Sequence, residues 1–122
     1  MKMQSFFFLS LYLLAFTKSA VAQDASIGKQ QFQDCIACHS TKAGENLLGP
    51  SLFAIYGRPA GTVEGYRYSN AVKKSGVTWD AASLNRYIDD PQGFIPGGRM
   101  PYSGMADEES RKNLIAYLKT LQ

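Results

Sequence analysis

Every cysteine and histidine of this 122-residue chain falls within five consecutive residues, Cys35-Ile36-Ala37-Cys38-His39. Two cysteines three positions apart at the end of a helix present both thiols on one face, and the next side chain is brought beside them. No other Cys or His exists in the chain to enlarge this set. The fold must therefore be organised around what these three side chains can bind together.

The spacing Cys-x-x-Cys-His is typical of covalent haem attachment. The thiols of Cys35 and Cys38 can add to the two vinyl groups of one haem, and the imidazole of His39 is then placed to bind the iron. Three alternatives stay open: a disulfide, which leaves His39 without a role, a redox dithiol, which needs a βαβ context, and a zinc site, which needs about four ligands. We expect one covalently bound haem c with its iron.

The first 22 residues differ in composition from the rest of the chain. Lys2 gives a positive start, 6–16 is nearly uninterrupted apolar sequence, and Ala20-Val21-Ala22 offers small residues at a cleavage site. An apolar run of about 11 residues is shorter than the roughly 20 that span a bilayer, which disfavours a retained membrane anchor. We predict a cleaved signal peptide over 1–22, a domain over 23–122, export to the periplasm, and no stable membrane insertion after cleavage.

Charge excludes some classes of function. Cleavage would remove Lys2 and Lys18, which lowers the number of Lys and Arg residues from 13 to 11 against 10 Asp and Glu. The predicted mature chain is almost neutral, and no basic block remains to indicate a nucleic-acid partner. The chain also has no second His and no recognisable carboxylate pair for acid–base catalysis, so we do not expect an enzyme.

Three segments of the mature chain have the apolar spacing of helices. The first covers 24–38, with Asp24 and Ser26 as possible caps and the cysteine motif at its end. The second covers 79–88, begins near Thr78 or Asp80, and is stopped by Asp90-Pro91. The third opens at Asp107-Glu108-Glu109 and presents an apolar stripe of Leu114, Ile115, Leu118 and Leu121.

The remaining stretches, 40–77 and 92–106, are rich in Gly and Pro and show no sustained periodicity, although 51–56 is a further candidate for a short helical turn. Loops of this length rarely support themselves in a small domain. A haem would supply the missing core. We therefore predict an all-α fold of three to five short helices with long loops wrapped around one haem.

The second axial ligand of the iron cannot be another histidine, because the chain has only one. Methionine is the obvious candidate, and outside the predicted signal peptide the chain has only Met100 and Met105. The segment Ile95-Pro96-Gly97-Gly98-Arg99-Met100-Pro101 constrains the backbone around Met100 more tightly than Gly104 does around Met105. This favours Met100 as the iron ligand.

Further short motifs follow one another along the chain. They are Gly28 and Phe32 before the attachment site, Gly49-Pro50-Ser51-Leu52, Tyr56-Gly57-Arg58, Gly65 to Ser69, Val77-Thr78-Trp79, Leu84 to Pro91, Phe94 to Met100, and Leu114 to Lys119. With the cysteine cluster, they resemble the class I cytochromes c of the bacterial and mitochondrial type. The resemblance covers essentially the whole predicted domain and implies the cytochrome c fold.

Several residue roles are implied by this resemblance. Met100 would be the distal iron ligand, and the Pro50 carbonyl would accept a hydrogen bond from the His39 ring and so orient it. Tyr87 would lie near the Met100 sulfur, and Gly28 would permit a close crossing of the first and last helices. Three side chains would hydrogen-bond or neutralise a buried haem propionate: Arg58, Tyr68 and Trp79. Simple core packing is the alternative for the aromatic residues.

The resemblance also implies a function: a soluble periplasmic carrier of single electrons between respiratory or photosynthetic chain partners. Such partners would be redox proteins, for example a membrane cytochrome complex, an oxidase or a periplasmic dehydrogenase, and we expect a monomer. A fixed subunit of a larger complex is one alternative, and a gas sensor or weak peroxidase is another if Met100 leaves the iron open. Several positions that are lysine in mitochondrial members are not basic here, including Asp34 and Gln92, which favours a weaker and less salt-sensitive encounter.

Overall fold

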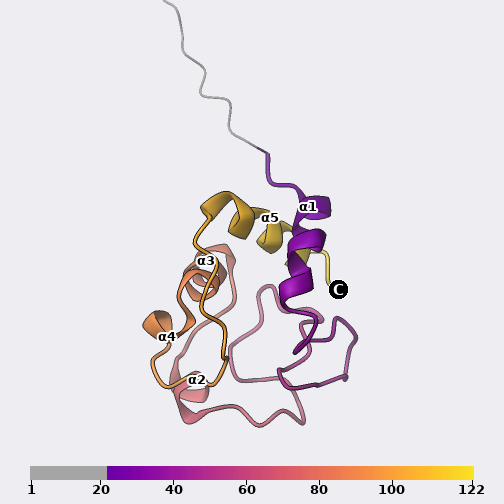
Figure 1. Ribbon diagram of the computed structural model, residues 1–122. Helices are drawn as coiled ribbons and strands as arrows, with labels where there is room; N and C mark the ends of the chain where they lie inside the picture. Colours follow the sequence, from indigo (N-terminus) through magenta and orange to yellow (C-terminus); the bar gives the residue numbers. More distant parts are fainter. Residues whose placement is uncertain (1–21) are drawn as a thin grey trace, which may run out of the picture.

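The computed structural model describes residues 22–122, so the predicted signal peptide lies outside the described residues except for Ala22. This part of the chain is helical, with one isolated bridge between Pro59 and Thr78 and no strand. Long loops join the short helices (Figure 1), and the all-α prediction is confirmed. The elements are α1 (Ala25–Gln31), the 3-10 helix η1 (Phe32–Asp34), α2 (Asn70–Lys74), α3 (Ala81–Asp89), α4 (Pro91–Phe94) and α5 (Glu108–Leu118).

Helices α1 and α5 cross closely at one end of the molecule, opposite α2 (Figure 1). Gly28 permits this approach, because a Cβ atom there would lie 1.9 Å from the Asn113 carbonyl oxygen. The side chain of Asn113 also accepts a hydrogen bond of 2.8 Å from the backbone N–H of Asp24. Beside the crossing, the rings of Phe32 and Tyr117 pack with their centroids 5.3 Å apart. The crossing predicted at Gly28 is confirmed.

Each of the three longer helices begins at an aspartate, which for the first two helices selects Asp24 over Ser26 and Asp80 over Thr78 as the cap. Asp24, Asp80 and Asp107 are the N-cap residues of α1, α3 and α5, and each carboxylate accepts hydrogen bonds from the first turn of its helix. Hydrogen bonds from a serine in that turn lower the pKa of each of these carboxyls from its ordinary value. The caps satisfy backbone N–H groups that otherwise have no partner in the helix.

The first helix and the expected turn after Pro50 differ from the prediction. The α-helical part of the first segment ends at Gln31, and the chain tightens into η1 before it reaches the cysteines. The range 51–56 forms turns and not a helix. Ala54 has a φ of 52° there, which is outside the right-handed helical region.

Two short helices lie in segments that the sequence pattern did not mark as helical. Ser69 caps α2 by accepting a hydrogen bond from the backbone N–H of Val72. Asp90 caps α4, whose first residue is Pro91. The pair Asp90-Pro91 therefore ends α3 as predicted and also begins the next helix, since proline is well tolerated at the first helical position.

The buried apolar residues form one core between the helices and the loops. The core residues are Phe32, Ile55, Val72, Trp79, Leu84, Ile88, Ile95, Leu114, Ile115 and Leu118.

No helix within 22–122 is long and apolar enough to cross a membrane.

Candidate haem site

The cysteine motif forms a tight turn directly after η1. The backbone N–H groups of Cys38 and His39 both donate to the Cys35 carbonyl oxygen, at 3.1 and 2.9 Å. Both cysteines are partly buried, and they are not joined to each other as the disulfide alternative requires. Burial raises the pKa of the Cys35 thiol to about 11, helped by the neighbouring Asp34 and Cys38. The turn therefore presents both thiols and one imidazole from the same short segment.

The ring of His39 is oriented by the loop that contains Pro50. Its Nδ1 lies 2.7 Å from the Pro50 carbonyl oxygen. Because a carbonyl only accepts hydrogen bonds, Nδ1 carries the proton and Nε2 keeps its lone pair for a metal. Burial lowers the pKa of His39, while the bond to Pro50 acts in the opposite direction. A second contact, from the Gly49 N–H to the Cys38 carbonyl at 2.7 Å, fixes this loop against the motif.

Gly49 has a role that the sequence analysis did not assign. A Cβ atom at this position would lie 2.4 Å from Cε1, 2.7 Å from Nδ1 and 2.9 Å from Nε2 of the His39 ring. These distances are far below van der Waals contact, so no larger residue fits without moving the imidazole. The available signal was the position of this glycine directly before Pro50, whose carbonyl oxygen accepts a hydrogen bond from the ring.

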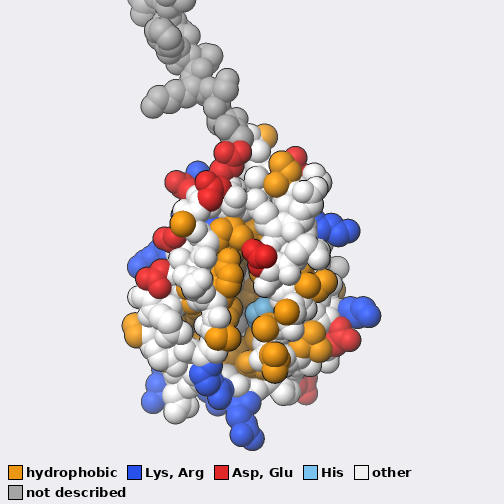
Figure 2. Space-filling model, in the orientation of Figure 1, with side chains coloured by type: hydrophobic (Ala, Val, Ile, Leu, Met, Phe, Trp, Pro, Cys, Tyr) orange, Lys and Arg blue, Asp and Glu red, His pale blue; other side chains and the backbone are white. Residues whose placement is uncertain are grey.

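The space beside the motif suits a flat apolar group. The cavity of about 460 Å³ that adjoins His39 is not this space, because most of its lining is polar and neither cysteine contributes to it. Figure 2 shows the histidine at the base of a hollow with largely hydrophobic walls. No three His, Cys, Asp or Glu side chains of residues 22–122 come together as a zinc site would need. The donors and walls fit a haem attached at Cys35 and Cys38.

The two candidate methionines, Met100 and Met105, lie in different surroundings. The backbone N–H of Met105 donates to the Ile88 carbonyl at 2.9 Å, and the Met105 side chain packs against the core. Gly104 brings this segment onto α3: its φ is +109°, and a Cβ atom there would lie 1.9 Å from the Asp89 carbonyl oxygen. Met100 is half-buried and is not among the residues packed against that core. Its thioether is therefore the one that remains available as a ligand.

Arg58 and Trp79 are brought together by pairing of their backbones. The Gly57 N–H donates to the Trp79 carbonyl at 2.7 Å, and the Trp79 N–H donates to the Arg58 carbonyl at 2.9 Å. The Trp79 ring is buried and packs on Tyr87, with centroids 4.9 Å apart, and Tyr87 in turn packs near Phe94 at 6.4 Å. Both aromatic residues therefore contribute to core packing, whichever further role they have.

Arg58 places a partly buried positive charge close to Tyr68. The guanidinium donates to the carbonyl oxygens of Phe53 at 2.8 Å and Ser51 at 3.1 Å, and it forms no ion pair within the described residues. The Tyr68 hydroxyl accepts from the Val63 N–H at 3.1 Å. Burial lowers the pKa of Arg58 and raises that of Tyr68. A carboxylate such as a haem propionate would supply the counter-charge that Arg58 lacks.

Arg111 on α5 is a structural residue that sequence reasoning missed. It is only 7% exposed. Its guanidinium donates to Asn85 Oδ1 at 2.8 Å and to Asp89 Oδ1 at 3.1 Å, both on α3. It also donates to the backbone carbonyls of Met105 at 2.7 Å and Ala106 at 2.9 Å. Arg111 thus joins α3, α5 and the end of the loop that carries Met100.

Comparison with known proteins decides the family. The sequence pattern of the family described as Cytochrome c matches residues 25–122. The chain belongs to the cytochrome c family. It is similar to cytochrome c2 of Blastochloris viridis, with 45% identity over 88% of this chain and 85% of that protein. It is also similar to cytochrome c2 iso-2 of Magnetospirillum molischianum, with 47% identity over 75% of this chain and 94% of that protein.

A solved structure agrees with this assignment. That of cytochrome cH from Methylobacterium extorquens matches with a TM-score of 0.76 and 42% identity, and it covers 80% of this chain and 98% of that chain. The class I monohaem assignment predicted from the sequence is confirmed. The protein carries one covalently bound haem c with its iron, and as a cytochrome c it is an electron carrier and not an enzyme.

Proposed function

We propose that this cytochrome c is a soluble periplasmic carrier of single electrons between respiratory or photosynthetic chain partners, exported by a cleaved signal peptide over 1–22. The observation that carries the proposal is the contrast between the two methionines: Met105 is engaged by the core, whereas Met100 is left available. His39 and Met100 would be the axial ligands. Both axial positions would then be filled, which leaves no open site for a gas or peroxide.

The attachment and ligand roles rest on this chain's own donors. Cys35 and Cys38 would form the two thioether bonds, and Pro50 would keep His39 in the tautomer whose Nε2 can bind iron. The bound haem supplies a one-electron iron couple. A neutral, soft thioether from Met100 in an apolar pocket favours the reduced form, so we expect a fairly high potential.

The periphery of the site would hydrogen-bond or neutralise the propionates. Arg58 lies near Tyr68 and pairs with the backbone of Trp79, and its partly buried positive charge has no acidic partner within the described residues. Tyr87, packed on Trp79, would complete the wall near Met100. The contacts described above and the family resemblance both support these assignments.

The surface around the motif is suited to brief contact with redox proteins such as a membrane cytochrome complex, an oxidase or a periplasmic dehydrogenase. Leu48 is 80% exposed, Ile36 54% and Leu47 48%, which gives this area an apolar character. Encounters through such a patch depend less on salt than encounters through a lysine ring. We expect a monomer that exchanges partners.

The first experiment compares optical spectra of the haem-loaded protein with those of two variants. We expect covalent haem bands and a weak near-infrared band from charge transfer between a methionine sulfur and ferric iron. Met100→Ala should abolish the near-infrared band and keep the covalent bands. Met105→Ala is the matched control and should keep both. Loss of the band in Met105→Ala alone would refute the Met100 assignment and make Met105 the ligand. Absence of the band from the parent protein at neutral pH would refute it too, and would favour a ligand-binding protein.

A further inference from the structure

The turn at 51–56 contains a backbone position that needs support from outside the turn. Ala54 has a φ of +52°, and it is the only residue of 22–122 other than glycine with a positive φ. In this left-handed region the Cβ atom of an L-residue comes too close to the following carbonyl oxygen, so the conformation is disfavoured. Such a position persists only where neighbouring contacts hold it, and it often occurs where function depends on the local geometry.

Two contacts from the segment 119–121, which follows α5, hold this turn. The backbone N–H of Ala54 donates a hydrogen bond of 2.5 Å to the Leu121 carbonyl oxygen. The Lys119 ammonium lies 4.8 Å from the centroid of the Tyr56 ring. The segment is itself anchored, because the Leu121 side chain packs against the core and the Lys119 N–H donates to a carbonyl of α5 at 3.0 Å. It therefore fixes the turn to α5.

The Arg58 guanidinium is held by the same turn. It donates to the carbonyl oxygens of Phe53 at 2.8 Å and Ser51 at 3.1 Å. The Phe53 carbonyl and the Ala54 N–H are the two ends of one planar peptide group, and in a trans peptide they point in opposite directions. This peptide group therefore accepts from Arg58 at its carbonyl end and donates to Leu121 at its N–H end. Rotation of the group would break both hydrogen bonds at once.

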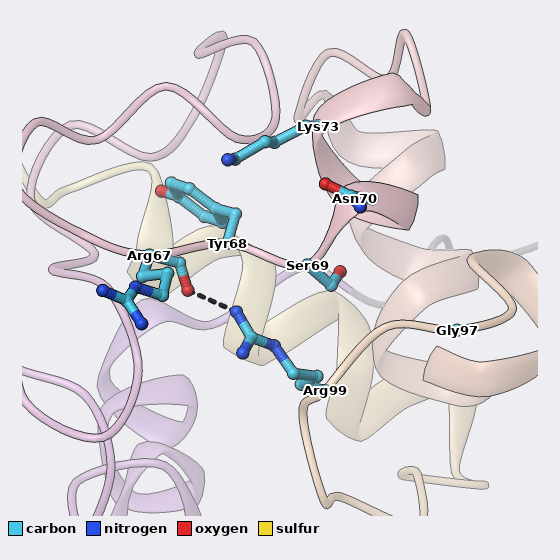
Figure 3. A pocket seen from close by; sticks show the side chains of 7 residues that line it. All are labelled: Arg67, Tyr68, Ser69, Asn70, Lys73, Gly97 and Arg99. Carbon is cyan, nitrogen blue, oxygen red and sulfur yellow. Dashed lines mark hydrogen bonds between the residues drawn. The ribbon is translucent and has the colours of Figure 1, made fainter.

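We propose that the segment 119–121 positions the Arg58 guanidinium and thereby sets the reduction potential of the haem iron. The inference rests on the proposed role of Arg58 at a haem propionate. A guanidinium has five N–H donors, so two bonds to backbone carbonyls orient the group and leave donors for a carboxylate. Arg58 also lies near Tyr68, whose side chain comes from the segment that leads into α2 (Figure 3). A positive charge held close to the iron disfavours the oxidised form, which has one more positive charge than the reduced form.

The first test pairs the reduction potential of the haem-loaded protein at neutral pH with hydrogen exchange at the Ala54 amide. Leu121→Gly removes the side chain that anchors the acceptor of this amide. We expect faster exchange at Ala54 and a shift toward the oxidised form, with the ratio of oxidised to reduced protein at a fixed solution potential about threefold higher. Thr120→Ala is the matched control, because it changes the adjacent exposed residue and keeps Leu121. It should alter neither measurement.

Further variants show whether the turn transmits the effect. Ala54→Gly in the Leu121→Gly background should restore roughly half of the shift in potential or more, because glycine adopts a positive φ without outside support. Simple loss of core packing would not be repaired in this way. Lys119→Gln removes the contact with the Tyr56 ring and should shift the potential in the same direction. Lys112→Gln removes the same charge from α5 without a contact to the turn, and it should shift the potential less.

Arg58→Gln separates this inference from the proposed function on which it rests. It should raise the ratio of oxidised to reduced protein about tenfold, and Leu121→Gly should then have no further effect. No shift in Arg58→Gln would refute the role of Arg58 at a propionate, and this inference with it. A shift in Arg58→Gln without one in Leu121→Gly, or unchanged exchange at Ala54 in Leu121→Gly, would overturn the inference alone.

The variants must also be shown to fold. Retained near-infrared and far-ultraviolet spectra would show that the shifts in potential do not come from loss of the Met100 ligand or of the helices. If Leu121→Gly does not fold, the comparison of Lys119→Gln with Lys112→Gln decides in its place: equal shifts in the two variants would overturn the inference.

Discussion

Replacement of Arg111 by methionine should destabilise the protein strongly, although this residue is remote from the cysteine motif in sequence. Methionine keeps much of the volume and the helix propensity of arginine but removes every donor. The Arg111 guanidinium makes four hydrogen bonds, two to side chains of α3 and two to the backbone carbonyls of Met105 and Ala106. The variant would leave these acceptors, gathered around a buried position, without their donors.

The expected loss follows from the exposure of each partner. A hydrogen bond to a charged group contributes about 1.5–3 kcal/mol. The contact with Asp89 contributes little to the free energy of unfolding, because the Asp89 side chain is 50% exposed and water can replace the arginine. The two backbone carbonyls and the amide oxygen of Asn85 remain. Since some of these will find water after the change, we expect a loss of about 3 kcal/mol in the free energy of unfolding.

The assay is thermal unfolding of the haem-loaded protein, followed by far-ultraviolet circular dichroism. For a domain of about 100 residues, a loss of 3 kcal/mol corresponds to a fall in Tm of roughly 12 °C or more. Lys112→Met is the control on the adjacent residue, because Lys112 is exposed and only pairs with Glu108 at 2.8 Å; it should cost at most about 0.5 kcal/mol. A loss below about 1 kcal/mol for Arg111→Met, or equal losses for both variants, would refute the reasoning.

Two further outcomes are expected. Gly49→Ala places a methyl group within 2.4–2.9 Å of three atoms of the His39 ring, so it should shift the oxidised haem spectrum toward the high-spin form while both thioether bonds remain. The lowered pKa of Asp107 means that its carboxylate stabilises the fold at neutral pH, and that this contribution is lost as pH falls through the ordinary value of 3.8 and then through the lower folded value. Asp107→Asn keeps a good cap but cannot titrate, so its urea midpoint should fall less between pH 7 and pH 3 than that of the parent.

Each of these outcomes has its own control. Gly44→Ala is matched to Gly49→Ala, because a Cβ atom at Gly44 meets no atom within 4 Å and only the φ of +74° strains the backbone; its haem spectrum should not change. An unchanged spectrum in Gly49→Ala would contradict the proposed contact with the ring. For Asp107→Asn, a midpoint that falls as steeply as that of the parent would show that the carboxylate does not contribute to the pH dependence.

The features that the sequence predicts well are those determined by local chemistry. The cysteine cluster predicts the cofactor, and aspartates near the expected helix starts mark the beginnings of α1, α3 and α5. These signals lie within one turn or one motif. The contact between His39 and Pro50 and the helix crossing at Gly28 were available only through the family resemblance, since nothing local relates residues that are distant in the chain.

The features that were missed depend on contacts between distant segments or on very short elements. Helices α2 and α4 have five and four residues, too few to show an apolar period, and only their caps identify them. Arg111 resembles the exposed Lys112 beside it, and its burial becomes evident only when α3 and the Met105 loop are placed around it. The turns at 51–56 depend on the positive φ of Ala54, which composition does not indicate.

The crossing of α1 and α5 also determines the order in which the molecule can be completed. The Asp24 N–H and the Asn113 side chain that accepts from it are separated by 89 positions, so the contact needs nearly the whole domain to be present. During synthesis the cysteine motif is made early and α5 last. Phe32 therefore has no Tyr117 ring to pack against until synthesis is almost finished. Closure over such a separation carries a large entropic cost and slows folding. A chain that ends before α5 would therefore expose the Phe32 ring of η1 and be recognisable to quality-control proteases.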